Sequence, residues 1–306
     1  MIRVTFLGTA ASRPTVGRNV SALILNREGE LLLFDCGEGT QRQMMRFGTG
    51  FAVHDIFFSH MHADHFLGVI GLLRTMGLQG REEPMRLWAP EGGAAILREA
   101  VNLGVDRVPF DILIEELAPD DRIARAGYEI VAYRAQHGTR ALGYALVEAE
   151  RLGRFHPDRA RELGVPEGPL FGKLHRGEAV EVDGRLITPE DVVGPPRPGR
   201  RIVYTGDSRP CRQTVEAARG ADVLIHDATF GSDEADRARQ TAHSTAREAA
   251  DVARKAGVGR LILTHISSRY ADDPRALERE ARDVFPRSTV AYDGLEIEIP
   301  YRQDDD

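Results

Sequence analysis

With 306 residues, of which 42% are hydrophobic and 28% are charged, the chain suits a globular protein with a sizeable core. The longest apolar runs fall short of the roughly 18 residues that cross a bilayer, and the first residues lack the pattern of a secretion signal, so we expect a cytoplasmic protein without membrane segments. Two cysteines exclude a disulfide framework, and a net charge of −7 argues against a nucleic-acid partner unless positive charges gather locally.

Short apolar runs alternate with helical patterns along the chain. We predict strands at 2–8, 21–26, 30–37, 55–60, 85–90, 110–117, 128–138, 143–150, 201–207, 221–230, 260–267 and 289–299. We predict helices at 40–48, 66–80, 92–104, 244–257 and 277–285. Because hairpins are mixed with strand–helix units, the sequence predicts an α/β fold built on mixed sheets.

Residues 151–200 differ from the rest of the chain. They are rich in Gly, Pro and charged residues and have few periodic apolar positions, so we expect them to bury little core. A plain surface loop is the alternative, but unstructured connections longer than about 15 residues are uncommon in compact domains. We therefore interpret this segment as an insertion or extended arm.

Side chains that bind metals follow apolar strands at four places: DIFFSHMHADH, YEIVAYRAQH, RIVYTGD and RLILTH. If these strands lie in one sheet, their ends bring together His60, His62, Asp64, His65, His137, Asp207 and His265. A single His or Asp after a strand is more often a cap or a satisfied polar group. Three imidazoles and a carboxylate within six residues, however, carry desolvation costs without a packing gain, so we interpret this cluster as ligands.

Seven ligands are too many for one tetrahedral zinc ion and fit two. In extended backbone, positions i and i+2 project to the same side, so His60 and His62 can share one ion together with His137. We assign Asp64, His65 and His265 to a second ion, and Asp207 as the bridge between the two. Zinc suits these ligands, with manganese or iron as alternatives. Such a pair can hydrolyse a phosphodiester, a lactam or a thioester, so the metals alone do not identify the substrate.

The sequence His60-Met61-His62-Ala63-Asp64-His65 resembles the signature of the metallo-β-lactamase superfamily. This resemblance implies a four-layer αβ/βα sandwich with two zinc ions at one edge. Within the superfamily, almost the whole chain resembles the ribonuclease Z family, the endonucleases that process the 3′ ends of tRNA. The segments that carry this resemblance are FLGTAASRPTVGRNVSALIL, LLFDCGEGTQRQ, YTGDSRPC, LIHDATF, AHST and LTHISSRY.

The resemblance also implies catalytic roles. Asp64 would accept a proton as well as bind metal, and His243 with Asp227 would protonate the leaving 3′ oxygen of the tRNA. Many family members have Glu where this chain has Asp227. From the residues alone, His243 can instead be read as a residue preceding the start of a helix, because Ser244 and Thr245 suit a helix cap.

By the same resemblance, residues 1–306 form a single metallo-β-lactamase-like domain, and residues 151–200 are an inserted, flexible arm that grips precursor tRNA. The arm contains nine Lys and Arg against eight Asp and Glu, a net charge of +1, so the remainder carries −8. The family is often homodimeric, with one subunit's arm holding tRNA for the other's active site. The residues expected to contact RNA are Arg18, Gly168, Pro169, Lys173 and Arg269.

Three alternatives remain open on the sequence. A hydrolase of small phosphodiesters, esters or lactams could use the same metals, although a small substrate has no use for a long arm. A non-catalytic RNA-binding protein is the second, but inactive relatives can dispense with ligands and this chain keeps the full set. For Arg18 and Arg269, the alternative to a phosphate contact is an ordinary solvated arginine. Val16 stands where some relatives carry a lysine, so a role of that lysine does not carry over.

Overall fold

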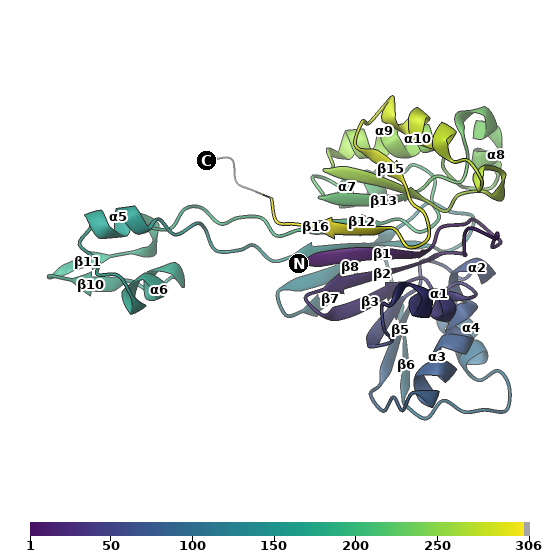
Figure 1. The fold of residues 1–306 in the computed structure, drawn as a ribbon, viewed down its shortest axis with the longest axis horizontal. Helices are drawn as coiled ribbons and strands as arrows, with labels where there is room; N and C mark the ends of the chain where they lie inside the picture. The colour runs from purple at the N-terminus through teal and green to yellow at the C-terminus, as the bar shows by residue number, and fades with distance from the viewer. Residues whose placement is uncertain (303–306) are drawn as a thin grey trace.

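The computed structural model describes residues 1–302, which form two mixed β-sheets packed face to face with helices on both outer sides (Figure 1). In spatial order, the first sheet consists of β16 (Glu296–Ile299), β1 (Ile2–Gly8), β2 (Ala22–Arg27), β3 (Glu30–Phe34), β4 (Val53–Phe57), β5 (Met85–Pro90) and β6 (Ile112–Leu117). The second consists of β15 (Ser288–Val290), β14 (Arg260–Thr264), β13 (Val223–Asp227), β12 (Arg201–Tyr204), β9 (Leu142–Glu148), β8 (Tyr128–Arg134) and β7 (Arg122–Arg125). Both sheets combine parallel and antiparallel neighbours, as the sequence predicts.

Three apolar layers separate the sheets and helices. Between the two sheets lies an aromatic-rich core, in which the rings of Phe34 and Phe57 stack 5.1 Å apart and Tyr144 and Tyr204 pack beside them. A second core joins the first sheet to α1, α3 and α4, and a third joins the second sheet to α7, α9 and α10. The order of layers is therefore helix, sheet, sheet, helix, which confirms the predicted four-layer sandwich.

Short helices connect the strands on the outer sides. Against the first sheet lie α1 (Thr40–Phe47), α2 (Ala63–Phe66), α3 (Gly68–Leu78) and α4 (Gly93–Val101). On the other side lie α7 (Arg212–Ala217), α8 (Ala235–Gln240), α9 (Ala246–Ala256) and α10 (Arg275–Arg282), with 3₁₀ turns η2 (Ser232–Glu234) and η3 (Ser268–Tyr270). Among residues 1–302, no helix has the length and apolar character that a membrane span needs.

The start of α9 fixes the loop that contains His243. The Thr245 side chain accepts a hydrogen bond from the Glu248 amide, and the Glu248 carboxylate accepts one from the Thr245 amide. This reciprocal pair satisfies two amides that a helix start otherwise leaves free. The predicted capping role of Thr245 is confirmed, and it holds the backbone two residues after His243 in place.

Several elements differ from the sequence-based prediction. β7, α7 and α8 were not predicted. The single strand predicted at 289–299 is wrong: β15 belongs to the second sheet, β16 belongs to the first, and a turn at Gly294, with φ of +88°, joins them. Asp-Gly is a strong turn signal, and here it outweighs the apolar residues on either side.

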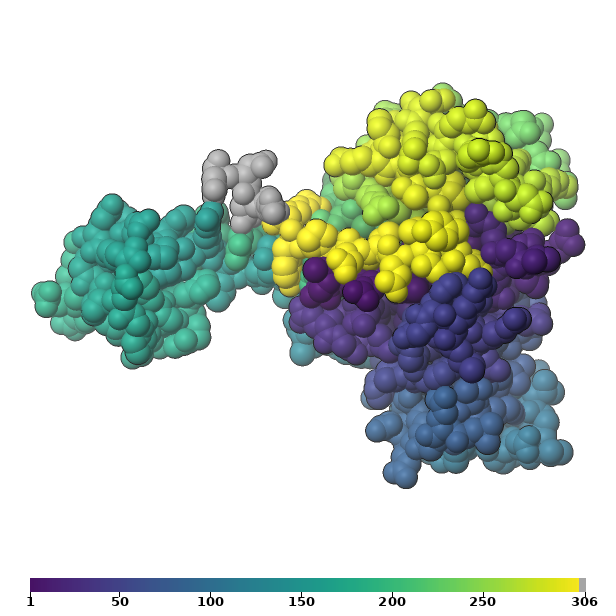
Figure 2. Space-filling model, in the orientation of Figure 1, coloured from purple at the N-terminus to yellow at the C-terminus, as the bar shows by residue number. Residues whose placement is uncertain are grey.

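Residues 151–200 leave the body after β9, return at β12, and end in a small lobe well away from the sheets (Figures 1 and 2). The lobe contains α5 (Pro157–Glu162), α6 (Pro169–His175), β10 (Val180–Val182), β11 (Arg185–Ile187) and η1 (Pro189–Asp191). It buries a core of its own, made of Ala160, Val165, Leu174, Val180, Ile187 and Val192. This core is small, as the sequence predicts, and a few well-spaced apolar residues suffice for so small a unit.

Candidate metal centre

The seven ligand candidates meet at one edge of the sandwich. Asp207, His137 and His265 follow the ends of β12, β8 and β14, and the remaining four lie in the segment from the end of β4 through α2. The ligand atoms of His60, His62, His137 and Asp207 all lie within 4.8 Å of one another, and so do those of Asp64, His65 and His265. The structure thus brings together all of the side chains that the strand-end pattern selected. The expectation of one shared sheet was wrong, because β4 belongs to the first sheet and β8, β12 and β14 belong to the second.

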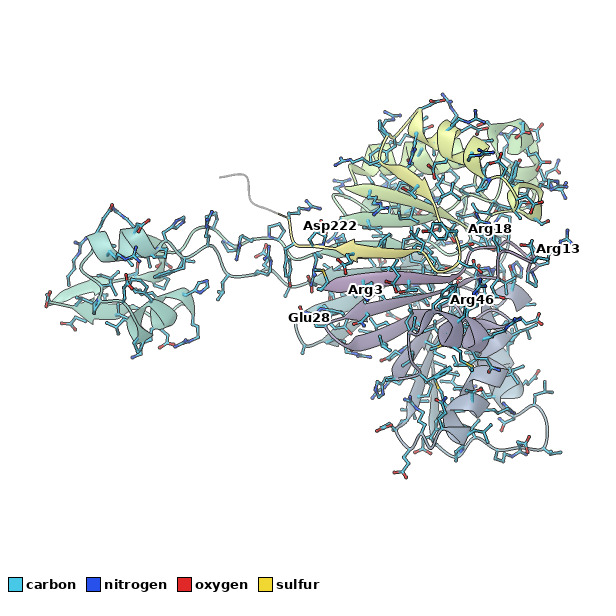
Figure 3. All side chains as sticks on the ribbon, in the orientation of Figure 1. Arg3, Arg13, Arg18, Glu28, Arg46 and Asp222 are labelled. Carbon is cyan, nitrogen blue, oxygen red and sulfur yellow. The ribbon has the colours of Figure 1, made fainter. Side chains whose placement is uncertain are left out.

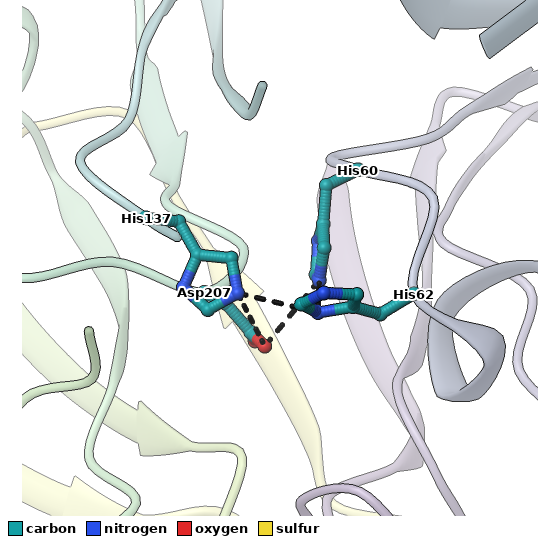
Figure 4. A group of neighbouring side chains, drawn as sticks. All are labelled: His60, His62, His137 and Asp207. Carbon is teal, nitrogen blue, oxygen red and sulfur yellow. Dashed lines mark hydrogen bonds and ion pairs between the residues drawn. The ribbon is translucent and has the colours of Figure 1, made fainter. Parts of the chain in front are cut away.

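The first group is His60, His62, His137 and Asp207, whose side chains converge in Figure 4. The Nε2 atom of His60 lies 2.9 Å from Nδ1 of His62, which is in turn 3.3 Å from Nε2 of His137. Oδ2 of Asp207 lies 3.6 Å from His60 Nε2 and 3.9 Å from His137 Nε2. Three imidazole nitrogens and one carboxylate oxygen therefore face a common point.

The second group uses the other oxygen of the same carboxylate. Oδ1 of Asp207 lies 3.3 Å from Nε2 of His65 and 3.3 Å from Nε2 of His265. Oδ2 of Asp64 lies 3.5 Å and 3.4 Å from the same two nitrogens. Asp207 thus presents one oxygen to each group, which is the arrangement of a carboxylate that bridges two cations.

Buried polar atoms support a metal at this place. His65 Nε2 and Asp207 Oδ1 are buried and have no hydrogen-bond partner within the described chain. An unpaired buried polar atom costs about 1–3 kcal/mol, so such atoms call for an unseen partner. Imidazole nitrogens and carboxylate oxygens gathered in this way fit a divalent metal ion as that partner.

Hydrogen bonds on the far side of the rings orient the imidazoles. His60 Nδ1 donates to Ser59 Oγ (3.0 Å), His65 Nδ1 to Asp35 Oδ2 (2.8 Å), and His265 Nδ1 to Thr229 Oγ1 (2.9 Å). His137 Nδ1 donates to the Ala242 carbonyl (2.9 Å). These bonds leave the Nε2 lone pairs free toward the centre, as metal-binding histidines require.

Asp35 is a functional residue that sequence reasoning missed. Its carboxylate is fully buried and accepts hydrogen bonds from His65, the Tyr204 hydroxyl (2.7 Å), and both the amide and the hydroxyl of Ser59 (2.7 and 2.8 Å). Asp35 and His265 adopt left-handed backbone with φ of +54° and +59°, a strain that tends to occur at functional sites. The signal was present, because Asp35 follows the apolar run LLLF just as Asp207 follows its strand.

His243 and Asp227 form a pair beside the ligands. His243 Nδ1 donates to Asp227 Oδ2 over 2.8 Å, and Asp227 Oδ1 accepts from the Thr229 amide and hydroxyl. Burial alone would lower the pKa of His243, but the charge and hydrogen bond of Asp227 outweigh it and raise the pKa to about 9. Asp227, which stands where many family members have Glu, is therefore long enough to hydrogen-bond His243.

Asp64 is oriented from the opposite side. Its Oδ2 accepts a hydrogen bond from the backbone amide of Ser12 over 2.8 Å. Burial would raise the pKa of Asp64, but hydrogen bonds and charge from His265 and His65 lower it. The Asp64 carboxylate is therefore ionised at neutral pH, the state that a metal ligand and a proton acceptor both require.

The arginines predicted to contact RNA lie in different surroundings. Arg18 is 6% exposed, and its guanidinium donates to Thr9 Oγ1 (2.7 Å) and to the Ala291 carbonyl (2.6 Å). We therefore replace its predicted phosphate contact with a structural role, the anchoring of the 12–19 loop. Figure 3 shows Arg13 on the outer side of this loop and Arg18 nearer the body. Sequence reasoning did not select Arg13.

Arg269 lies on an exposed groove of about 430 Å³ next to His243. Arg13 and Arg237 line the same groove, and the Arg237 guanidinium lies 6.0 Å from the centre of the Phe230 ring. The groove thus combines three cations with an aromatic ring. The three arm residues, Gly168, Pro169 and Lys173, lie at the start of α6 and within it, all exposed on the distant lobe.

Comparisons with known proteins agree with the fold. Two family models match parts of the chain: a beta-lactamase superfamily domain over residues 192–266 and the anti-Pycsar protein Apyc1 over residues 2–107. Ribonuclease Z of Gemmatimonas aurantiaca is 60% identical over 97% of this chain and 95% of that protein. Ribonuclease Z of Myxococcus xanthus is 55% identical over 99% of both. The crystal structure of the short form of human tRNase Z superimposes with a TM-score of 0.71 at 28% identity, covering 97% of this chain and 99% of that one.

Proposed function

Since this chain belongs to the ribonuclease Z family of endoribonucleases that process the 3′ ends of tRNA, we propose that it does so with two zinc ions held by the seven ligands. The observation that carries this proposal is the Asp207 carboxylate, with one oxygen toward each group of ligands. Zinc ions at these positions would lower the pKa of a water molecule between them and offset negative charge on the phosphate.

The remaining residues define the chemistry at phosphorus. Water gives one proton to the Asp64 carboxylate and forms the new P–O bond as the bond from phosphorus to the 3′ oxygen breaks. His243 has Nδ1 committed to Asp227, so its Nε2 proton is the one available to the leaving 3′ oxygen. The products are a tRNA with a 3′ hydroxyl and a trailer with a 5′ phosphate.

The groove beside His243 supports a path for the RNA strand. Arg13, Arg237 and Arg269 offer guanidinium groups to phosphates. Arg269 has one ion pair, with Glu234 at 3.5 Å, on a side chain 45% exposed, so little energy is lost when it turns to a phosphate.

We extend the proposal to the arm, which we take as the site that holds the body of precursor tRNA. A hydrolase of small diesters is the second candidate, and it would make the lobe unnecessary. The two functions are separable because the strands of the arm touch near the lobe. The two strands lie so close at this point that a Cβ added to Gly153 would be 1.8 Å from the Gly194 carbonyl oxygen. A two-residue Asn-Gly turn can therefore join Gly153 to Gly194 in place of residues 154–193.

We expect this deletion to lower kcat/KM for precursor tRNA by about 100-fold, since roughly 3 kcal/mol of phosphate contacts would be lost. Hydrolysis of bis-p-nitrophenyl phosphate should stay within about twofold, because the diester is too small to touch the lobe. Both rates are measured on the same preparations. Unchanged tRNA cleavage by the deletion variant would favour the small-molecule candidate.

We also propose a homodimer in which one subunit's arm serves the other's active site. Exposed apolar side chains near the ends of α3 and α4 support an interface: Leu78 is 90% exposed, Leu103 62% and Val105 92%. The Arg74 side chain donates to the Leu103 carbonyl and so joins these two regions.

We also propose a cytoplasmic location, since the free thiols Cys36 and Cys211 suit a reducing compartment.

Mixing subunits tests the exchange of arms. Arm-deleted subunits and Asp207→Asn subunits should each cleave tRNA far more slowly than the parent, whereas their mixture should regain activity through heterodimers that pair an intact arm with an intact centre. The readout is tRNA cleavage after the subunits are unfolded and refolded together. A dimeric mixture without regained activity would contradict an arm that works across the interface.

A further inference from the structure

The lobe of the arm depends on its stalk for its direction. Its apolar core is separate from the three cores of the body. The stalk consists of residues 150–155 leaving the body and residues 193–200 returning, joined by bridges between Arg151 and Arg197 and between Phe155 and Val193. The orientation of the lobe is therefore set where the stalk meets the sheets.

The returning strand is firmly fixed at that root. Arg200 is 2% exposed, and its guanidinium donates to both oxygens of Glu148, at 2.7 and 2.8 Å. Glu148 also accepts from Arg27 Nε over 2.9 Å. A bidentate, buried pair of this kind has a defined geometry. Arg151, on the outgoing strand, takes part in no such pair with Glu148.

Residues 299–302 cross the root of the arm and contact both strands. Arg200 donates to the Ile299 carbonyl over 3.1 Å. The guanidinium carbons of Arg151 and Arg200 lie 3.7 and 3.9 Å from the centre of the Tyr301 ring. Arg302 Nε then donates to Asp222 Oδ1 over 2.6 Å. Figure 3 shows Asp222 at the end of the sandwich from which the arm leaves.

We propose that Tyr301 is a positioning residue for tRNA cleavage, because its one ring holds the arginines of both stalk strands and so fixes the direction of the arm. This inference rests on the proposed role of the arm in holding tRNA. Cation–π contacts at these distances are favourable and prefer a defined geometry. They connect the outgoing strand to the buried Arg200–Glu148 pair.

The effect on the substrate follows from the length of the stalk. At roughly 3.3 Å per residue, the six residues of the outgoing strand span about 20 Å, so a rotation of about 10° at the root moves the lobe by about 3 Å. A shift of this size separates a held tRNA from the catalytic side chains, which tolerate about 1 Å of misplacement. A small diester, bound at the centre alone, is not affected.

The test compares Tyr301→Ala with Tyr301→Phe, which keeps the ring. Spin labels at Glu181→Cys on β10 and Lys255→Cys on α9, in a Cys211→Ser background, report the distance between lobe and body. We expect a narrow distance distribution in the parent and the Phe variant, and a broad one in the Ala variant. In unlabelled protein, the Ala variant should raise KM for precursor tRNA about tenfold and leave bis-p-nitrophenyl phosphate hydrolysis and the melting temperature unchanged.

Three results would overturn the inference. The first is an Ala variant with the parent's distance distribution, and the second is a broad distribution with an unchanged KM for tRNA. A Phe variant as broad as the Ala variant would also overturn it, because the ring would then not be the cause. These outcomes are distinct from failure of the proposed arm function. That failure would appear as unchanged tRNA cleavage by the variant that lacks residues 154–193.

Discussion

Replacing Asp207 with Asn should lower the cleavage of both precursor tRNA and bis-p-nitrophenyl phosphate by at least about 1000-fold, since metal ions stabilise the transition state by several kcal/mol. The carboxylate lies between the two ligand groups and contacts His60, His65 and His265. Asn offers one neutral oxygen in its place, so it cannot hold two cations with two charged oxygens. Both substrates depend on the same centre, so both rates should fall together.

The metal content should fall in parallel. We expect about two zinc ions per chain in the parent and one or fewer in Asp207→Asn, measured by elemental analysis after dialysis. Asp251→Asn, on the exposed face of α9, removes the same charge away from the centre and should keep both the metal and the activity. A variant at position 207 with full metal content and normal rates would contradict the bridging role.

Folding should survive this substitution. In the ion-free chain, Asp207 Oδ1 is a buried acceptor without a hydrogen-bond partner among residues 1–302. Because replacing such a group by a neutral one of the same shape relieves a desolvation cost, circular dichroism and the melting temperature of the metal-free protein should change little. A rate lost through unfolding would appear in these measurements.

The ligands were predictable from sequence because their signal is local. Each lies shortly after an apolar strand, and the end of β4 in the first sheet meets the ends of β8, β12 and β14 in the second at one edge of the sandwich. The family resemblance then supplied His243 and Asp227, which the strand-end pattern does not distinguish from other polar residues. Asp35 had the same local signal as Asp207, but the sequence analysis placed it inside the strand predicted at 30–37 and not after a strand end.

The sequence-based predictions that were wrong or missing concern contacts between residues far apart in sequence. Arg18 reads as a surface cation, but the carbonyl of Ala291, from the opposite end of the chain, makes it a buried anchor. The segment predicted as one strand at 289–299 forms two strands, because β15 pairs with β14 in the second sheet and β16 pairs with β1 in the first. The contact of Tyr301 with Arg151 and Arg200 has no periodic or motif signal at all. Such features depend on the assembled fold and are visible only there.

His243→Ala should separate the two substrates. Protonation of the leaving oxygen contributes about 100- to 10,000-fold when the leaving group is a poor one, as the 3′ hydroxyl of a ribose is. We therefore expect tRNA cleavage to fall by about this factor. Nitrophenolate leaves readily without a proton, so bis-p-nitrophenyl phosphate hydrolysis should fall by less than about tenfold. Single-turnover rates on both substrates measure the difference, and equal losses would contradict a proton-donating role.

The pH dependence of tRNA cleavage by the Asp227→Asn variant is a second test of proton donation by His243. The charge and hydrogen bond of Asp227 hold the pKa of His243 up against burial, at about 9 in the ion-free chain. A general acid works only while protonated, so tRNA cleavage should decline as the pH rises through that pKa. Cations at the centre would lower this pKa in parent and variant alike. Since Asn lacks the charge, the alkaline decline should begin at lower pH in Asp227→Asn, whereas Asp227→Glu should keep the parent's profile. A decline at the same pH in all three proteins would show that another group donates the proton.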